Sequence, residues 1–376
     1  MSKVQLLNLG NDDVYYVKNK DKDLMSFRWE IIDDETATPI DVTIIDNSTP
    51  LFICNGLASW LESRTPPKHR QFMYELLSSM NMKSVKDVID FSKGLSLNDT
   101  FWVANDRHLT WDSINLFDNE FDETISRIAF DGGLFGKRVK TTSPEFGTNG
   151  MLPKCWVRES DGIVYLKKGG TSGACNTGLE PYSEVLASQL LDTLGYNHVT
   201  YTVENFRGKL VSSCPLFTSK SIGMIPMYLV CSIGSVFNIV NFCKLNKIAD
   251  ELYRMLIFDY LSLNSDRHGN NFAVLFDTDT YALKGLAPIY DNGASMLNYY
   301  VSGSSLYEYN KNNVPQLYDS FSSLAKYSKK NISIPHNVNN LIGFKFDRSQ
   351  VPGYSNDRLD FLEEFIQGRV QEFLSW

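Results

Sequence analysis

The chain has 376 residues and a formal net charge of −8, and 43% of its residues are hydrophobic against 21% charged. This balance is typical of a globular protein with two or three packed units, and it excludes a largely disordered chain. General nucleic-acid binders usually carry an excess of basic residues, so we expect no direct binding to DNA or RNA.

The cysteines and the apolar segments indicate in which compartment of the cell the protein is expected. The six cysteines include no C-x-x-C pair, and six in a chain of this length do not resemble a disulfide framework. The N-terminus lacks the apolar run of a signal peptide. The longest apolar stretch, residues 223–240, is interrupted by proline, glycine and polar residues. We therefore expect a cytoplasmic protein without a zinc site and without a membrane partner.

Residues 1–135 form the first predicted unit, an N-terminal α+β subdomain. Clusters of β-forming residues predict two short strands, over residues 13–17 and 41–45. Residues 68–80 place apolar side chains on one face of a helix. Ser84 stands three residues before Asp87, the spacing of a capping box, so a second helix is expected to begin there.

Residues 136–220 form the second predicted unit. A compact strand is expected over residues 163–166, followed by a helix over residues 181–194 that Gly195 ends. Two further strands are expected to pair as a hairpin, over residues 199–203 and 209–218. Strand, helix, strand and strand in this order indicate a small α+β unit.

Residues 221–376 form the third predicted unit, in which helices dominate. Residues 249–263 are apolar nearly all round the helix, which predicts a central, buried position. The last helix is expected to begin near Asp357, with a one-sided apolar stripe that packs on a core.

The segment most informative about chemistry follows the buried helix. A polar loop that contains Asp266 and Asn271 leads into a short apolar strand, and a turn over residues 277–280 then brings the chain back to Asp291. Phosphoryl transfer needs one carboxylate to orient the attacking hydroxyl and oxygen ligands to hold Mg²⁺. This pattern predicts that Asp266 faces the acceptor and that the other two residues bind Mg²⁺. Asp and Asn also cap helices and form turns, so a purely structural role is the alternative.

The same residues resemble the HipA-like toxin kinases, bacterial Ser/Thr kinases with a two-lobed fold distantly related to phosphoinositide 3-kinase. Their loop has the approximate pattern D-x-H-x-x-N, matched by residues 266–271, followed by L-x-P-x-Y-D, matched by residues 286–291. The resemblance implies transfer of the ATP γ-phosphate to a protein hydroxyl, with ATP and Mg²⁺ as cofactors. It implies Asp266 as catalytic base and His268 as a supporting residue, for which a packed, hydrogen-bonded histidine is the alternative.

The resemblance covers about residues 136–376 and implies a fold with a small α+β N-lobe, a helical C-lobe over residues 221–376 and an extra N-terminal subdomain. Residues 143–154 would form a flexible loop over the ATP phosphates. Gly147 and Gly150 allow backbone amides to approach an anion there, and Lys154, which ends the loop, is a candidate ATP-binding residue. An ordinary surface loop is the alternative.

The strand that follows should supply the lysine that binds the nucleotide. Consecutive strand residues face opposite sides, so only one of Lys167 and Lys168 can face the cleft. The family pattern favours Lys168. Glu184 in the next helix is a candidate partner for this lysine, or a glutamate favoured by the helix dipole. Pro215 and Phe217 lie where the hinge that contacts adenine belongs.

The resemblance also implies regulation and partners. Ser143 and Thr148 are the nearest counterparts of the regulatory serine that the family phosphorylates in its phosphate loop. A protein substrate and a DNA-binding antitoxin are the expected partners. Two alternatives stay open: a small-molecule or lipid kinase of the same fold, and a pseudokinase that serves as an interaction module.

Overall fold

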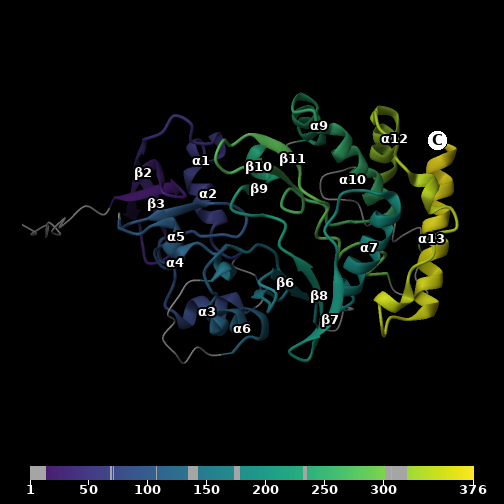
Figure 1. Cartoon of the computed structure of the whole chain (residues 1–376), viewed down its shortest axis with the longest axis horizontal. Helices are drawn as coiled ribbons and strands as arrows, with labels where there is room; N and C mark the ends of the chain where they lie inside the picture. Colours follow the sequence, from purple (N-terminus) through teal and green to yellow (C-terminus); the bar gives the residue numbers. More distant parts are fainter. Residues whose placement is uncertain are drawn as a thin grey trace, which may run out of the picture.

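The structure is a computed structural model, and it describes residues 14–67, 70, 72–106, 108–133, 143–172, 178–231, 235–300, 306 and 320–376. Within these residues the chain forms three small antiparallel sheets surrounded by helices (Figure 1). The mixture of helices and antiparallel sheets agrees with the predicted α+β class. The predicted boundary between residues 135 and 136 lies outside the described residues.

The N-terminal sheet has the strand order β3-β2-β1-β4. Its strands are β1 Tyr15–Asn19, β2 Lys22–Ile31, β3 Ala37–Ile44 and β4 Phe101–Ala104. Six helices accompany it: α1 Leu51–Cys54, α2 Leu57–Ser63, α3 Met73–Ser79, α4 Val85–Ser92, α5 Trp111–Ile114 and α6 Glu123–Asp131. The capping box of Ser84 and Asp87 is confirmed at the start of α4. The helix predicted from residue 68 begins only at Met73, because Phe72 has a left-handed backbone with φ of 66°.

The second sheet has the order β5-β6-β8-β7 and packs against helix α7. The elements are η1 Pro144–Gly147, β5 Lys154–Arg158, β6 Val164–Gly169, α7 Glu180–Leu194, β7 Thr202–Phe206 and β8 Lys209–Pro215. Gly195 ends α7 in the left-handed conformation with φ of 65°, as predicted. The hairpin of β7 and β8 turns at Arg207 and Gly208, and both residues have positive φ. Two-residue turns with this conformation match the twist of the strands that they connect.

The third sheet has the order β11-β10-β9 and lies beside the C-terminal helices. Its strands are β9 Ile222–Pro226, β10 Ala273–Asp277 and β11 Leu283–Leu286. The helices are α8 Met227–Val230, α9 Val236–Leu245, α10 Ala249–Ser262, α12 Phe321–Asn331 and α13 Asn356–Ser375, with the short turns η2 Val338–Leu341 and η3 Arg348–Gln350. The described residues of the apolar stretch 223–240 therefore belong mainly to β9, α8 and α9. None of the helices within the described ranges combines the length and apolar composition needed to cross a membrane.

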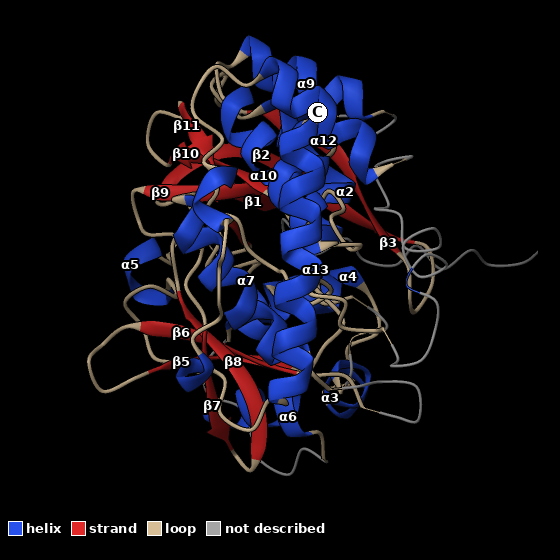
Figure 2. Ribbon diagram, turned by 90° about the vertical axis from the view of Figure 1, so that its right-hand side faces the viewer, coloured by secondary structure: helices blue, strands red, loops and turns tan. Residues whose placement is uncertain are grey.

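Helix α10 is the centre of the C-terminal part, as its nearly uniform apolar surface predicted. It packs against α9, α12 and α13, and Figure 2 shows α13 running along one side of the molecule. The hydroxyl of Tyr260 donates a hydrogen bond to Glu372 Oε2 at 2.7 Å, which connects α10 to α13. Lys329 Nζ donates to the carbonyl of Phe373 at 2.8 Å, which connects α12 to α13.

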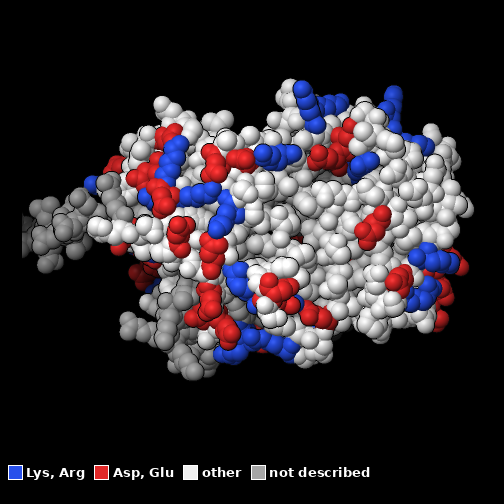
Figure 3. All heavy atoms as spheres, in the orientation of Figure 1, with Lys and Arg blue, Asp and Glu red and all other residues white. Residues whose placement is uncertain are grey.

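The N-terminal elements contact both of the other sheets. The side chain of Arg70 donates to the carbonyl of Lys154 on β5 at 2.7 Å. The carbonyl of Asn98 accepts a hydrogen bond from the backbone N–H of Met224 on β9 at 2.6 Å. Asn19 Nδ2 donates to the carbonyl of Thr278 after β10 at 2.7 Å. The face drawn in Figure 3 shows acidic and basic side chains interspersed over these elements, without one continuous basic surface in its described part.

Candidate active site

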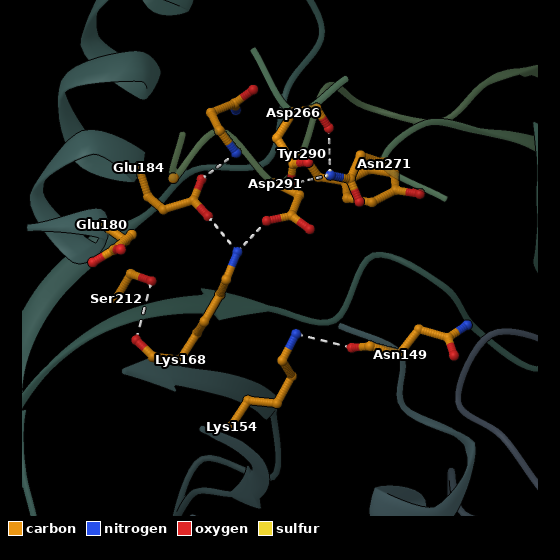
Figure 4. A network of polar contacts seen from close by, with 12 residues as sticks. Asn149, Lys154, Lys168, Glu180, Glu184, Ser212, Asp266, Asn271, Tyr290 and Asp291 are labelled. Carbon is orange, nitrogen blue, oxygen red and sulfur yellow. Dashed lines mark hydrogen bonds and ion pairs between the residues drawn. The ribbon is translucent and has the colours of Figure 1, made fainter. Parts of the chain in front are cut away.

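Three charged side chains from distant parts of the chain meet beside the second sheet. Lys168 Nζ on β6 lies 2.9 Å from Glu184 Oε1 on α7, and it also donates to Asp291 Oδ1 in the loop after β11 (Figure 4). Glu184 accepts a second hydrogen bond, from the backbone N–H of Asn292 at 2.7 Å. One lysine thus joins Glu184 on the helix of the second unit, the partner that the sequence suggested, to the loop that carries Asp291.

The ionisation of this cluster follows from its burial. Burial opposes the charged form of Lys168, but the carboxylates of Asp291 and Glu184 outweigh it and raise the lysine pKa. Burial would raise the pKa of Asp291, yet the attraction of Lys168 and Lys154 lowers it overall. Burial raises the pKa of Glu184. Asp291 is therefore the more firmly ionised carboxylate, the form that a divalent cation requires.

The loop after α10 holds Asp266 and Asn271 together. Asn271 Nδ2 donates to the backbone carbonyl of Asp266 at 2.8 Å and to its Oδ2 at 3.2 Å. The Asp266 side chain is 46% exposed, and His268 Nε2 lies 3.8 Å from its Oδ1. Burial raises the pKa of Asp266, while His268 acts in the opposite direction. An accessible carboxylate of this kind can accept a proton from an incoming hydroxyl.

Arg267 fixes this loop, and the sequence reasoning did not identify it. Its guanidinium forms a buried ion pair with Asp259 of α10 at 3.0 Å. It also donates to the backbone carbonyls of Asn271 at 2.6 Å and Tyr290 at 2.7 Å, and to Asn292 Oδ1 at 2.7 Å. Arg267 thereby connects the loop of Asp266 to the loop of Asp291. In the sequence, an arginine in a polar loop suggests a solvent-exposed side chain. The signal of a buried, structural role is Asp259, the acidic residue of the preceding helix with which Arg267 pairs.

The structure separates the two candidate lysines. On β6, Lys168 faces the cluster with Glu184 and Asp291, whereas Lys167 faces the other side of the sheet. Lys167 Nζ donates to Glu204 Oε1 at 2.5 Å and to Ser213 Oγ at 3.0 Å. The alternation of strand residues explains this difference, because neighbouring side chains point to opposite faces.

Residues 143–148 differ from the flexible phosphate loop that the resemblance implied. Ser143 is only 1% exposed, and residues 144–147 form a buried turn. A Cβ added at Gly147 would lie 2.9 Å from the carbonyl oxygen of Leu95, so glycine is needed there for packing against the N-terminal unit. The hydroxyl of Thr148 accepts a hydrogen bond from Trp156 Nε1 at 2.9 Å. The Ser143 hydroxyl is thus buried and the Thr148 hydroxyl is hydrogen-bonded, and phosphorylation of either residue stays a prediction.

The second half of the predicted loop leads to the sheet that carries Lys168. Lys154 begins β5, where it is paired with Lys168 of β6. Its Nζ donates to the backbone carbonyl of Asn149 at 2.8 Å. Gly150 has φ of 94°, and a Cβ there would come within 2.3 Å of Lys154 Nζ. Both residues therefore lie beside Lys168 on the second sheet.

The predicted hinge residues lie between the second and third sheets. Pro215 is the last residue of β8, opposite Tyr165. The ring of Phe217 lies 5.8 Å from the ring of Tyr290, next to Asp291. The segment from β8 to β9 therefore passes along the edge of the cluster, as a connection between two lobes does.

The candidate metal ligands, Asp291 and Asn271, carry oxygen donors, the type of ligand that Mg²⁺ takes. In the part of the chain that the structure describes, no three His, Cys, Asp or Glu side chains are grouped as metal ligands. Zinc and other soft metals usually require such a group. Mg²⁺ keeps several waters and often takes only one or two protein carboxylates together with substrate phosphates. Asp291 and Asn271 match that smaller requirement.

Comparison with known proteins shows the fold. No protein-family model and no curated protein matches the chain. HipA of Shewanella oneidensis MR-1, solved with HipB and operator DNA, is similar over 96% of this chain and 98% of its own, with a TM-score of 0.53 and 11% identity. The proinflammatory kinase CtkA of Helicobacter pylori is similar over 59% of this chain and 90% of its own, with a TM-score of 0.41 and 15% identity. The chain therefore has the two-lobed, kinase-like α+β fold of HipA, which confirms the predicted fold class.

Proposed function

We propose that this chain is an ATP- and Mg²⁺-dependent Ser/Thr protein kinase of the HipA-like type. The observation that carries the proposal is the meeting of Lys168, Glu184 and Asp291 next to the loop of Asp266 and Asn271. Phosphoryl transfer depends on positioning and on charge, and these residues supply a cation for the phosphates, metal ligands and a base. The HipA-like fold supports the same reading.

The proposed chemistry assigns one task to each side chain. Lys168 binds the phosphates of ATP, and Glu184 holds the lysine in place. Asp266 accepts the proton of the acceptor hydroxyl. The oxygen of that hydroxyl bonds to the γ-phosphorus as the bond from this phosphorus to ADP breaks. Asp291 and Asn271 would hold Mg²⁺, which neutralises charge on the transferred group. Arg267 holds the loop of Asp266 and the loop of Asp291 in place. It does so through its ion pair with Asp259 and its hydrogen bonds to the backbone carbonyls of Asn271 and Tyr290.

We also propose the organisation and the partners. Residues 136–220 serve as the N-lobe, residues 221–376 as the C-lobe and residues 1–135 as an additional subdomain. HipA of Shewanella oneidensis was solved with HipB and operator DNA in a toxin–antitoxin system. A DNA-binding antitoxin is therefore the proposed partner of this chain, and a protein hydroxyl is its proposed acceptor.

The test uses the purified chain, γ-labelled ATP, Mg²⁺ and cell extract, with Asp266→Asn as the variant. This substitution keeps the size of the side chain and removes its basicity. We expect label on one or a few proteins with the wild type and a loss of that label with Asp266→Asn at unchanged thermal stability. Label that appears only on small molecules or lipids would overturn the protein-kinase assignment. Equal labelling by both forms would overturn the role of Asp266.

A further inference from the structure

One edge of the N-terminal sheet exposes apolar side chains to solvent. Strand β3 stands at the end of the order β3-β2-β1-β4, with β2 as its neighbour. The densest group of exposed large apolar side chains among the described residues lies on these two strands and directly after them: Ile31, Ile32, Ile40, Val42, Ile44 and Ile45. Figure 1 shows β2 and β3 at the end of the molecule opposite α13. Apolar side chains gathered in this way often mark an interaction surface.

Three of these side chains point to the face of the sheet that carries its core. Ile44 is paired with the fully buried Met25 of β2, and residues directly opposite each other share a face. Alternation along the strands places Val42 on the face of Ile44, and Ile31 on the face of Met25. Yet Ile31, Val42 and Ile44 are 58%, 44% and 50% exposed. We call these three residues the open face.

Helices cover the same side of the sheet closer to β1. Tyr15 of β1 is paired with Phe27 of β2, which lies two residues from Met25 and so on the same face. The hydroxyl of Tyr15 donates to Asp90 of α4 at 2.8 Å. A sheet of an α+β protein normally buries its apolar face against helices. The helical layer that begins with α4 therefore ends before it reaches the open face.

The chain around the open face is acidic. Every charged side chain between residues 30 and 46 is Asp or Glu. Two of them, Asp34 and Asp46, form ion pairs with lysines. Glu30, Glu35 and Asp41 are exposed, and none of the three forms an ion pair within the described ranges. Such charges attract a basic partner, and they oppose a second copy of this chain, which would bring the same acidic residues to the contact.

We propose that the open face binds an amphipathic helix of a partner protein, with apolar side chains on Ile31, Val42 and Ile44 and with Lys or Arg side chains along its borders. Such a helix would extend the layer of α4 and bury the apolar side chains. Its basic residues would compensate the acidic ones. The inference is independent of the proposed function, because none of these residues belongs to the candidate active site.

The test uses the full chain and two fluorescent peptides of known composition. The lysine peptide is a helix of about five turns, built from Leu, Ala and Lys with its leucines on one face between two rows of lysine. The glutamate peptide replaces every Lys with Glu. Fluorescence anisotropy measures the affinity of both for the wild type. We expect the lysine peptide to bind at least about tenfold more tightly than the glutamate peptide, because the surface is acidic.

Two variants locate the binding site. Val42→Thr with Ile44→Thr makes the open face polar and keeps the β-branched side chains that strands favour. We expect about a tenfold loss of affinity for the lysine peptide, since two apolar contacts are lost. The control is Leu245→Gln, which removes an 84% exposed apolar side chain of α9 and should bind as the wild type does. If its melting temperature shows a loss of fold in the double variant, Val42→Thr alone, with about a threefold loss, takes its place.

A third variant tests the charges. Glu30→Gln, Glu35→Gln and Asp41→Asn together keep the shapes of the side chains, and Asn tolerates the left-handed backbone of Asp41, with φ of 51°. We expect about a threefold loss of affinity for the lysine peptide at low salt and a smaller loss at high salt.

Several outcomes would overturn the proposal. These are no binding of the lysine peptide, equal affinity for the two peptides, or an equal loss in Leu245→Gln. A wild-type dimer in sedimentation, which Val42→Thr with Ile44→Thr dissociates, would assign the open face to a second copy instead. At least about tenfold tighter peptide binding after removal of residues 1–13 would assign it to the N-terminal residues of the chain itself.

Discussion

The guanidinium of Arg267 lies 3.0 Å from the carboxylate of Asp259, and both side chains are at most 1% exposed. The pair connects the last turns of α10 to the loop of Asp266. Removing one partner of a buried ion pair typically costs about 3–5 kcal/mol, because the remaining charge is left without compensation. We predict a loss of this size in the free energy of unfolding for Arg267→Met, measured by urea denaturation.

A double variant distinguishes the two contributions of Arg267. Arg267→Met with Asp259→Leu removes both charges and should recover part of the stability. It should not recover phosphotransfer, because Arg267 also holds the backbones of Asn271 and Tyr290. Full activity in the double variant would mean that the loop is positioned by other contacts.

Asp266→Asn should reduce the rate of phosphotransfer and leave nucleotide binding intact. Loss of a general base typically lowers kcat by roughly 10²–10⁴-fold. Asp266 is half-exposed, and the hydrogen bonds that Lys168 donates within the described residues go to Glu184 and Asp291, so the affinity for an ATP analogue should change by less than about twofold. Single-turnover rates measure the loss of phosphotransfer, and equilibrium titration measures the affinity for the ATP analogue. A variant that loses affinity and rate together would assign Asp266 to nucleotide binding.

The two neighbouring lysines of β6 should behave differently. Lys168→Met leaves Glu184 and Asp291 close together without a cation, so we expect lower stability and at least about a tenfold loss of nucleotide affinity. Lys167→Met removes pairs with the carboxylates of Glu159 and Glu204 on the other face of the sheet, so it should leave the nucleotide affinity close to that of the wild type. Fluorescence titration with a labelled nucleotide checks both. Equal losses of affinity would contradict the assignment of Lys168 to the cleft.

Lys154 should make the stability of the free protein depend on pH. Its pKa is about 7 in the folded protein and 10.5 as an ordinary lysine. Between these values the unfolded chain holds a proton that the folded protein has released, so stability increases with pH. The charged groups around it are Lys168, Asp291, Arg70 and Glu184, and all of them remain in a Lys154 variant.

Lys154→Met removes this dependence. The variant should be more stable than the wild type below pH 7, by about 1–4 kcal/mol, since replacing a buried charge with an apolar side chain is often stabilising. This advantage should shrink as the pH rises toward about 10. Melting temperatures of both proteins across this range provide the measurement. A difference that stays constant with pH would show that Lys154 keeps its charge throughout.

Local sequence rules predicted the parts of the fold whose determinants are close in the chain. Helix α7 ends at Gly195, and α10 is buried as its apolar surface indicated. The hairpin of β10 and β11 returns Asp291 close enough to Asp266 for its charge to raise the pKa of that carboxyl. These features depend on spacing within short segments, which the sequence displays directly.

Contacts between distant segments were not predictable in this way. The buried turn of residues 144–147 depends on Arg70, whose guanidinium lies 3.5 Å from Glu145 with both side chains fully buried. Strand β4 forms beside β1, which is separated from it by most of the N-terminal unit. The sequence alone could not decide which of Lys167 and Lys168 faces α7. Alternation along a strand shows that the two side chains point to opposite faces of the sheet, but not which face lies against α7.

The N-terminal subdomain is hydrogen-bonded to β5 through Arg70 and to β9 through Asn98, so it contacts both the second and the third sheet. Rotation of the second sheet relative to the third must break or stretch one of these hydrogen bonds. The rate at which nucleotide enters and leaves would then depend on a region that does not touch it. In the proposed kinase, a protein that bound this subdomain would change the rate of nucleotide exchange without competing for the nucleotide site.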